Sequence, residues 1–207
     1  MFKRFAVSLA LLAITSASLA QAPAPQIRLR ATIEKVDAGS ITVKERSGEV
    51  ITLVRPANME VSEVFPLALS DIKAGSYVGT AAMPQADGTQ LALEVLVFPE
   101  AARGSGEGHR PWDLRPDSTM TNATVADLAA APTSVPGGQK LTLKYKDGEK
   151  TVIVPPGVPV VSFKPGKADE QALVVPGAKV LITAQEKDGK PTALRMIVGR
   201  NGFAPPM

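Results

Sequence analysis

The stretch ITVKERSGEVITLVRPANMEV, residues 41–61, aligns without a gap to LTLKYKDGEKTVIVPPGVPVV, residues 141–161, so that each residue has its counterpart 100 positions later. Apolar and polar residues alternate in both stretches, which is typical of strands with one face buried. Ser47-Gly48 and Asp147-Gly148 occupy the centres, and such pairs favour tight hairpin turns. The match predicts an internal repeat of β-hairpins.

The match continues on both sides of these hairpins, with offsets that change only in the connections. ADGTQLALEVLVF from Ala86 matches KDGKPTALRMIVG from Lys187, KAGSYVGTA around Gly75 matches VPGAKVLIT around Gly177, and ATIEKV from Ala31 matches ATVADL from Ala123. We therefore expect two copies of one unit of about 75 residues, at the small end of domain sizes. The predicted boundaries are 21–98 for the first unit and 119–200 for the second.

Each copy is predicted to hold five strands and no long helix, because 18 Pro are scattered along the chain and no helical stripe is present. One short helical turn is expected within 65–72. Alternation places Leu93, Val95, Leu194 and Met196 in the core, and the matched pair Glu94 and Arg195 on the outer face. The last residues, 201–207, are expected to be extended and disordered.

The strand count and order are those of a small OB-like barrel, whose closure removes exposed strand edges. The Ala-Thr starts at Ala31 and Ala123, the glycine turns and the closing Asp-Gly hairpins resemble exported bacterial OB-like domains of unknown function, present here as a tandem duplication. The resemblance implies an all-β fold of two tandem five-stranded OB-like barrels in an exported protein. It implies no catalytic residue.

The first 20 residues, MFKRFAVSLALLAITSASLA, combine Lys3 and Arg4 with a short apolar run and a small-residue ending, which predicts a cleaved signal peptide. The apolar run is too short for a membrane span, so we expect a periplasmic or secreted protein. Without Lys3 and Arg4 the formal net charge falls from +3 to +1, and nucleic acid is not an expected partner. The chain has no Cys, which excludes disulfides and thiolate chemistry.

Residues 99–118 lie between the copies and have no counterpart, yet they contain His109 and Trp112, the only His and the only Trp. Three glycines in the first half of this insertion and two prolines in its second half make it irregular. We expect it to fold back on the barrels, with Trp112 as its anchor, and to determine what the protein binds. The predicted binding residues are His109, Arg110, Trp112, Asp113, Leu114 and Arg115.

Imidazole and thioether ligands suit monovalent copper, and an indole face can lie against that cation. A periplasmic OB-fold copper chaperone family uses one His, two Met and one Trp in this way, but its ligands lie on barrel strands. Here the corresponding candidates are His109, Met120 and Met83, with Trp112 beside them. Met59 and Met196 are better explained as core or rim residues.

Other chemistries have weaker support in the sequence. Four carboxylates fall in the insertion, but their spacing does not match a calcium loop. They are Glu100, Glu107, Asp113 and Asp117. GSGEG lacks the lysine of a phosphate-binding loop, and a set of Ser105, His109 and Asp113 has no strained nucleophile turn.

Two function classes follow. The favoured one is a non-catalytic cell-envelope binding or interaction module whose partner is a protein or another envelope component. The alternative is a periplasmic protein that binds or traffics monovalent copper, and no other cofactor is expected.

Overall fold

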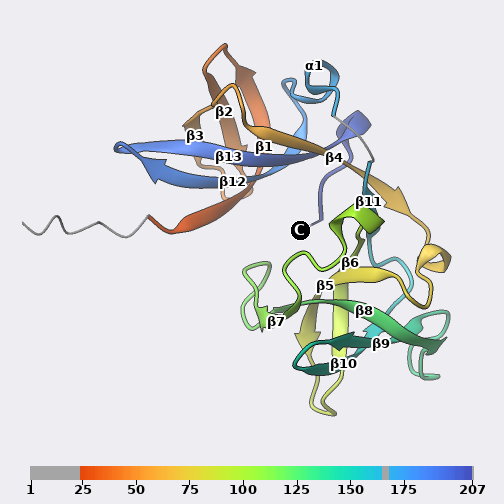
Figure 1. Cartoon of the computed structure of the whole chain (residues 1–207). Helices are drawn as coiled ribbons and strands as arrows, with labels where there is room; N and C mark the ends of the chain where they lie inside the picture. Colours follow the sequence, from red (N-terminus) through yellow and green to blue (C-terminus); the bar gives the residue numbers. More distant parts are fainter. Residues whose placement is uncertain (1–23, 165–167, 207) are drawn as a thin grey trace, which may run out of the picture.

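A computed structural model of the protein describes residues 24–164 and 168–206, and the predicted signal peptide lies outside these residues. The fold is all-β, with thirteen strands in one continuous sheet and one short helix, α1 (Glu170–Leu173). The strands form two groups, which are separate in Figure 1. We name these groups lobe 1 and lobe 2.

Lobe 1 contains strands from both ends of the described chain. Its strands are β1 (Gln26–Val36), β2 (Ser40–Glu45), β3 (Val50–Val54), β12 (Lys179–Lys187) and β13 (Lys190–Gly199). Antiparallel pairing runs from β3 through β2, β1 and β12 to β13, and one parallel bridge between Thr192 and Val54 returns to β3. The pairing therefore forms a closed circuit.

Lobe 2 is built from one continuous part of the chain. Its strands are β5 (Tyr77–Pro84), β6 (Gln90–Val97), β8 (Thr119–Ala130), β9 (Gln139–Tyr145) and β10 (Gly148–Val154). The pairing runs from β10 through β9, β8 and β5 to β6, and a parallel pairing of β10 with β6 closes the circuit. Lobe 2 thus has the same pairing pattern as lobe 1.

Two further strands join the lobes. The first half of β4 (Glu60–Leu67) pairs with β13, and its second half pairs with β11 (Val160–Phe163), which also pairs with β6. Beside this crossing the buried carboxylate of Glu63 accepts two hydrogen bonds from Arg200, at 2.9 and 3.0 Å. β4 and β11 therefore tie the two circuits together.

The predicted units 21–98 and 119–200 do not match this pairing. The hairpin β5–β6 pairs with β8, β10 and β11 of the following segment, whereas the hairpin β12–β13 returns to β1, β3 and β4 at the start of the chain. A hairpin in either position would bury the same apolar face, so sequence pattern alone does not distinguish the two arrangements.

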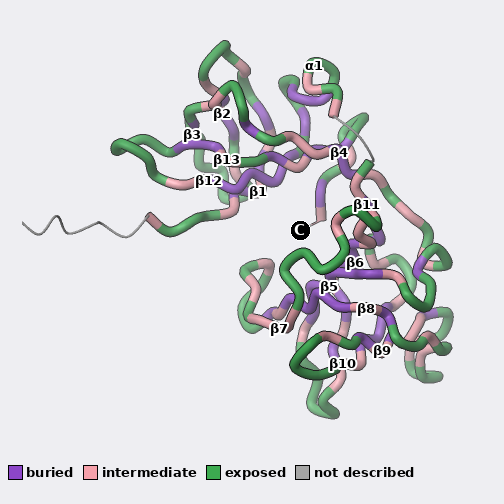
Figure 2. Tube along the Cα trace, viewed as in Figure 1, coloured by how far each residue is buried: buried purple, intermediate pink, exposed green. Residues whose placement is uncertain are grey.

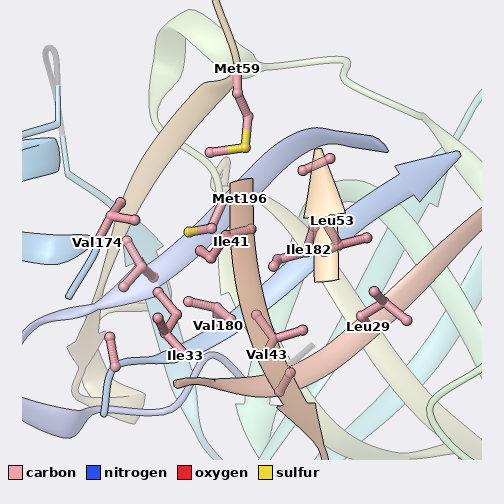
Figure 3. Close-up of a cluster of buried hydrophobic side chains, with 14 of the residues drawn as sticks. Leu29, Ile33, Ile41, Val43, Leu53, Met59, Val174, Val180, Ile182 and Met196 are labelled. Carbon is pink, nitrogen blue, oxygen red and sulfur yellow. The ribbon is translucent and has the colours of Figure 1, made fainter. Parts of the chain in front are cut away.

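Each lobe encloses a hydrophobic cluster. Buried segments, purple in Figure 2, run through both lobes. In lobe 1, Ile41, Val43 and Leu53 pack against Ile182 and Met196, as Figure 3 shows. In lobe 2, Leu141 and Leu143 pack with Val78 and Val152. A smaller cluster between the lobes includes Leu96, Val161 and Leu181.

The alternation of buried and exposed side chains expected along β6 and β13 is interrupted in both strands. On β6 the residues paired with Ala81 and Ala82 are Glu94 and Ala92, so Leu93 is the extra residue of a β-bulge. Leu194 has the same position on β13. The bulge reverses the faces of the strand, because side chains alternate at every residue.

Val95 and Met196 are therefore buried as predicted, but Leu93 and Leu194 are only half-buried. Glu94, predicted to face solvent, is 1% exposed, whereas Arg195 is exposed as predicted.

The minor elements agree only in part with the sequence-based expectations. Leu69–Asp71 forms a 3₁₀ turn within the predicted range. In the described part of the tail, Phe203 packs against the cluster between the lobes and Pro205 is buried. Among the described residues no helix is both long and apolar enough to cross a membrane.

Candidate functional site

The insertion folds back on lobe 2 and adds a strand to it. β7 (Gly108–Pro111) pairs antiparallel with β8, and Arg110 lies opposite Met120 in this register. Before β7 the chain is attached to lobe 2, because Glu107 accepts a hydrogen bond from the amide of Lys146 at 3.0 Å. The strand order at this edge is therefore β6–β5–β8–β7.

A closed turn after β7 positions Trp112 and Asp113. The amide of Trp112 donates to the carbonyl of Ser118 at 2.8 Å, and the Ser118 hydroxyl bonds the backbone of Arg115. Asp117 has a positive φ of 60°, a conformation that Asp tolerates better than most residues. The turn therefore places the Trp112 side chain toward lobe 1.

Trp112 and Asp113 contact two arginines of β1 in lobe 1. The guanidinium of Arg28 lies 4.0 Å from the centre of the Trp112 ring, and that of Arg110 lies 5.6 Å away. Asp113 pairs with Arg30 at 2.9 Å and with Arg28 at 3.3 Å. Partial burial raises the pKa of Asp113, but the hydrogen bonds and charges of both arginines lower it overall.

A pocket of about 210 Å³ lies between the lobes beside this turn. Its floor is the outer face of lobe 2, where Gly79, Leu96, Met120 and Asn122 line it. Two rows of paired residues, Glu94–Ala81–Met120–Arg110 and Leu96–Gly79–Asn122–Gly108, cross the strands there.

The walls of the pocket come from the other parts of the chain. The insertion provides Ser105, Arg110 and Trp112, and strands β11 and β13 provide Phe163, Arg195 and Ile197. Both lobes and the insertion therefore contribute to one pocket.

Asn122 lies on the pocket floor with one polar atom unused. Its Nδ2 donates to the Ser105 carbonyl at 3.0 Å, whereas its buried Oδ1 has no hydrogen-bond partner. A Cβ built on Gly79 would lie 2.8 Å from this oxygen, so the close approach requires glycine. Trp112 Nε1, also buried, has no partner either. Both unpartnered atoms belong to residues that line the pocket, and both are covered by protein atoms.

Glu94 lies in the row that contains Met120 and is buried. Burial raises its pKa to about 8, although Arg30 and Arg46 oppose the shift by their charges. Neither carboxyl oxygen has a hydrogen-bond partner among the described residues. Glu94 is therefore mostly uncharged at neutral pH.

The proposed copper ligands do not share one face of the sheet. His109 Nδ1 and Thr121 Oγ1 are 2.8 Å apart, which places His109 on the face opposite to that of the adjacent Met120. Met83 is on the face of Met120, two residues along β5 from its paired residue Ala81. Burial and the charges of Lys150 and Arg110 lower the pKa of His109 and thus favour its neutral ring.

The remaining predicted residues are dispersed. Arg110 lines the pocket, Leu114 is half-buried and Arg115 is exposed outside the pocket. Glu100 pairs with Arg103 at 2.6 Å, and Asp113 with Arg30, so these two carboxylates of the insertion have separate partners. Within 24–164 and 168–206, no three His, Cys, Asp or Glu residues form a group able to hold a metal.

The sequence did not identify Arg28, Glu94, Asn122 or Arg195 as residues of the site. Asn122 is within a strand pattern, and Arg28 and Arg195 are near the two ends of the chain. Their proximity depends on the pairing of β1 with β12, which no local pattern indicates. The burial of Glu94 depends on the β-bulge at Leu93, which the sequence pattern did not reveal.

Comparisons with known proteins give no family for the chain. No family model matches it, and no significant match was found among curated proteins or solved structures.

Proposed function

We propose that the protein is a non-catalytic binding module of the cell envelope, built from two OB-like barrels, that accepts a small envelope component between them. In this proposal each closed strand circuit is one barrel, and the pocket beside Trp112 is the binding site. OB-like barrels commonly bind ligands on an open sheet face and its loops, and the pocket floor is such a face.

The observation that supports this proposal best is the composition of the pocket. Lobe 2, the insertion and strands β11 and β13 all line it, and its buried Asn122 Oδ1 and Trp112 Nε1 lack partners. Buried polar groups are normally paired, so unpaired ones in a pocket favour a ligand site.

The contacts of His109 and Asp113 support a non-catalytic role. His109 is hydrogen-bonded to Thr121 on the face away from the pocket, and Asp113 is paired with Arg30. In this proposal both side chains hold the insertion in place. Placement in the periplasm or outside the cell follows from the predicted signal peptide and is part of the proposal.

Native mass spectrometry of the purified protein tests the proposal. The protein is incubated with the small-molecule fraction of an envelope extract and then transferred to the gas phase under gentle conditions. We expect one retained adduct in the wild type and its loss in Met120→Trp, which fills the pocket floor.

The matched control is Met83→Trp, which enlarges a half-buried methionine outside the pocket lining. An adduct that survives in Met120→Trp, or the absence of any adduct in the wild type, would refute the pocket as the binding site.

A further inference from the structure

Two arginines at the pocket have no acidic partner. Arg110 donates to the Gly106 carbonyl at 2.8 Å and Arg195 to the Thr183 hydroxyl at 3.2 Å, and among the described residues neither makes an ion pair. By contrast, Arg28 is paired with Asp113. Two positive charges of the pocket lining are therefore not neutralised.

The surroundings of Arg110 disfavour its positive charge in the absence of an anion. Burial lowers the pKa of Arg110, and the charge of nearby Arg28 lowers it further. The buried carboxyl group of Glu94, on the floor face, is mostly neutral at pH 7 and supplies little opposing charge. An anion would therefore be favoured in the pocket.

The rest of the pocket lining is apolar and aromatic. Leu96, Phe98, Met120, Phe163 and Ile197 form it, and Phe98 and Phe163 meet edge to face with ring centres 6.5 Å apart. The volume of about 210 Å³ exceeds the roughly 150 Å³ of a cavity that takes benzene but is below the range for drug-sized ligands. One ring or a short aliphatic chain fits this space.

We propose that the pocket binds a small organic acid, with its carboxylate at Arg195 and Arg110 and its apolar body against Phe98, Phe163 and Met120. Guanidinium groups suit carboxylates because they offer several donors in one plane. This inference rests on the proposed function and names the chemical class of its ligand.

A matched acid and amide test the inference. Phenylacetate and 2-phenylacetamide have nearly the same shape, but only the acid is charged at pH 7. Because Trp112 is the only Trp and lines the pocket, its fluorescence reports binding directly, and calorimetry gives the affinity. We expect phenylacetate to bind at least about 10-fold more tightly than the amide, as a charge-assisted hydrogen bond would provide.

The variant Arg195→Gln should remove most of this preference and change the affinity for the amide by less than about threefold. Arg195 is exposed, so the variant is expected to fold. Arg115→Gln is the control, because Arg115 is an exposed arginine of the insertion outside the pocket. It should bind both compounds as the wild type does.

Equal affinity for acid and amide would overturn the inference but leave the proposed function intact. The inference also fails if acetate binds as tightly as phenylacetate, because the apolar lining would then contribute nothing. If neither aromatic compound changes the Trp112 signal, the organic-acid class is wrong, and the mass spectrometry test decides separately whether the pocket binds anything.

Discussion

Lobe 1 and lobe 2 have the same pairing pattern but present different outer faces to each other. After each bulge, lobe 2 has Glu94, which is buried and mostly neutral, whereas lobe 1 has Arg195, which is exposed and charged. Lobe 1 adds Arg28 beside Trp112, and only lobe 2 carries β7. The comparison teaches that two similar frameworks form an asymmetric pocket through a few residues on their facing surfaces.

The lobes also differ in which parts of the chain provide their strands. All strands of the lobe 2 circuit lie between Tyr77 and Val154, whereas the lobe 1 circuit needs strands from both ends of the chain. Lobe 2 is therefore the more independent of the two. Four experiments test this comparison.

The largest expected effect is that one fragment of the chain folds and another does not. A fragment of residues 75–164 contains every strand of the lobe 2 circuit and should show one cooperative urea transition. A fragment of residues 119–200, one complete predicted unit, lacks β5 and β6 and should be largely unfolded. Circular dichroism and urea denaturation measure both. A stable 119–200 monomer would show that β12 and β13 can also close on β8.

Core truncation in lobe 2 should have the next largest effect. Leu141 is fully buried, so Leu141→Ala should lower the free energy of unfolding by about 2–5 kcal/mol. Leu93→Ala, at the half-buried bulge, should cost roughly 1 kcal/mol. Urea denaturation of the full chain compares the two. Equal losses would argue that Leu93 packs inside the lobe and that the bulge is misplaced.

Glu94 should make stability depend on pH. Folding raises its pKa from 4.5 to about 8, so its contribution is fully present below about pH 4.5 and is lost as the pH rises to about 8. Glu94→Gln keeps a neutral side chain and should be more stable than the wild type at pH 8.5 by a few kcal/mol, since one pKa unit corresponds to about 1.4 kcal/mol.

Urea midpoints at several pH values measure this difference, with the exposed Glu49→Gln as the control. A Glu94→Gln protein whose stability falls with pH as steeply as that of the wild type would exclude Glu94 as the titrating group.

The smallest effect concerns the contact between the insertion and β1. Asp113 is partly exposed, so Asp113→Asn should lower the free energy of unfolding by only about 0.5 kcal/mol. The effect should shrink in 1 M salt, because screening weakens exposed ion pairs. Thermal denaturation at low and high salt measures it. A loss that is independent of salt would indicate that Asp113 acts through packing rather than charge.

The all-β fold and most strand positions were predictable because alternation and turn residues are local signals. The hairpin at Ser47-Gly48 and its match at Asp147-Gly148 lie between paired strands as expected. The choice of partner for β12 was not predictable, since both lobes offer a similar apolar face. The bulges at Leu93 and Leu194 add one residue without any Gly or Pro to mark it.

The candidate site was predictable only where the composition was unusual. A single Trp among glycines and prolines pointed to the insertion, and Trp112 does contact β1 through Arg28. Arg195 and Asn122 are common residue types within ordinary strands and therefore gave no signal. The pairing of Met120 with His109 as metal ligands overlooked the alternation of faces on β8, which separates them.

The return of β12 and β13 to β1 has a consequence for synthesis of the chain. As residues emerge from the ribosome in order, the segment Gln26–Val54 has no partner for β1 on one side until Lys179–Gly199 has been made. The later segment Tyr77–Val154 acquires all its partners first, so the middle of the protein is expected to fold before its beginning. Contacts between such distant segments slow folding, and the early strands stay exposed during this delay. The N-terminal hairpin is thus the part of the nascent chain most dependent on protection from aggregation.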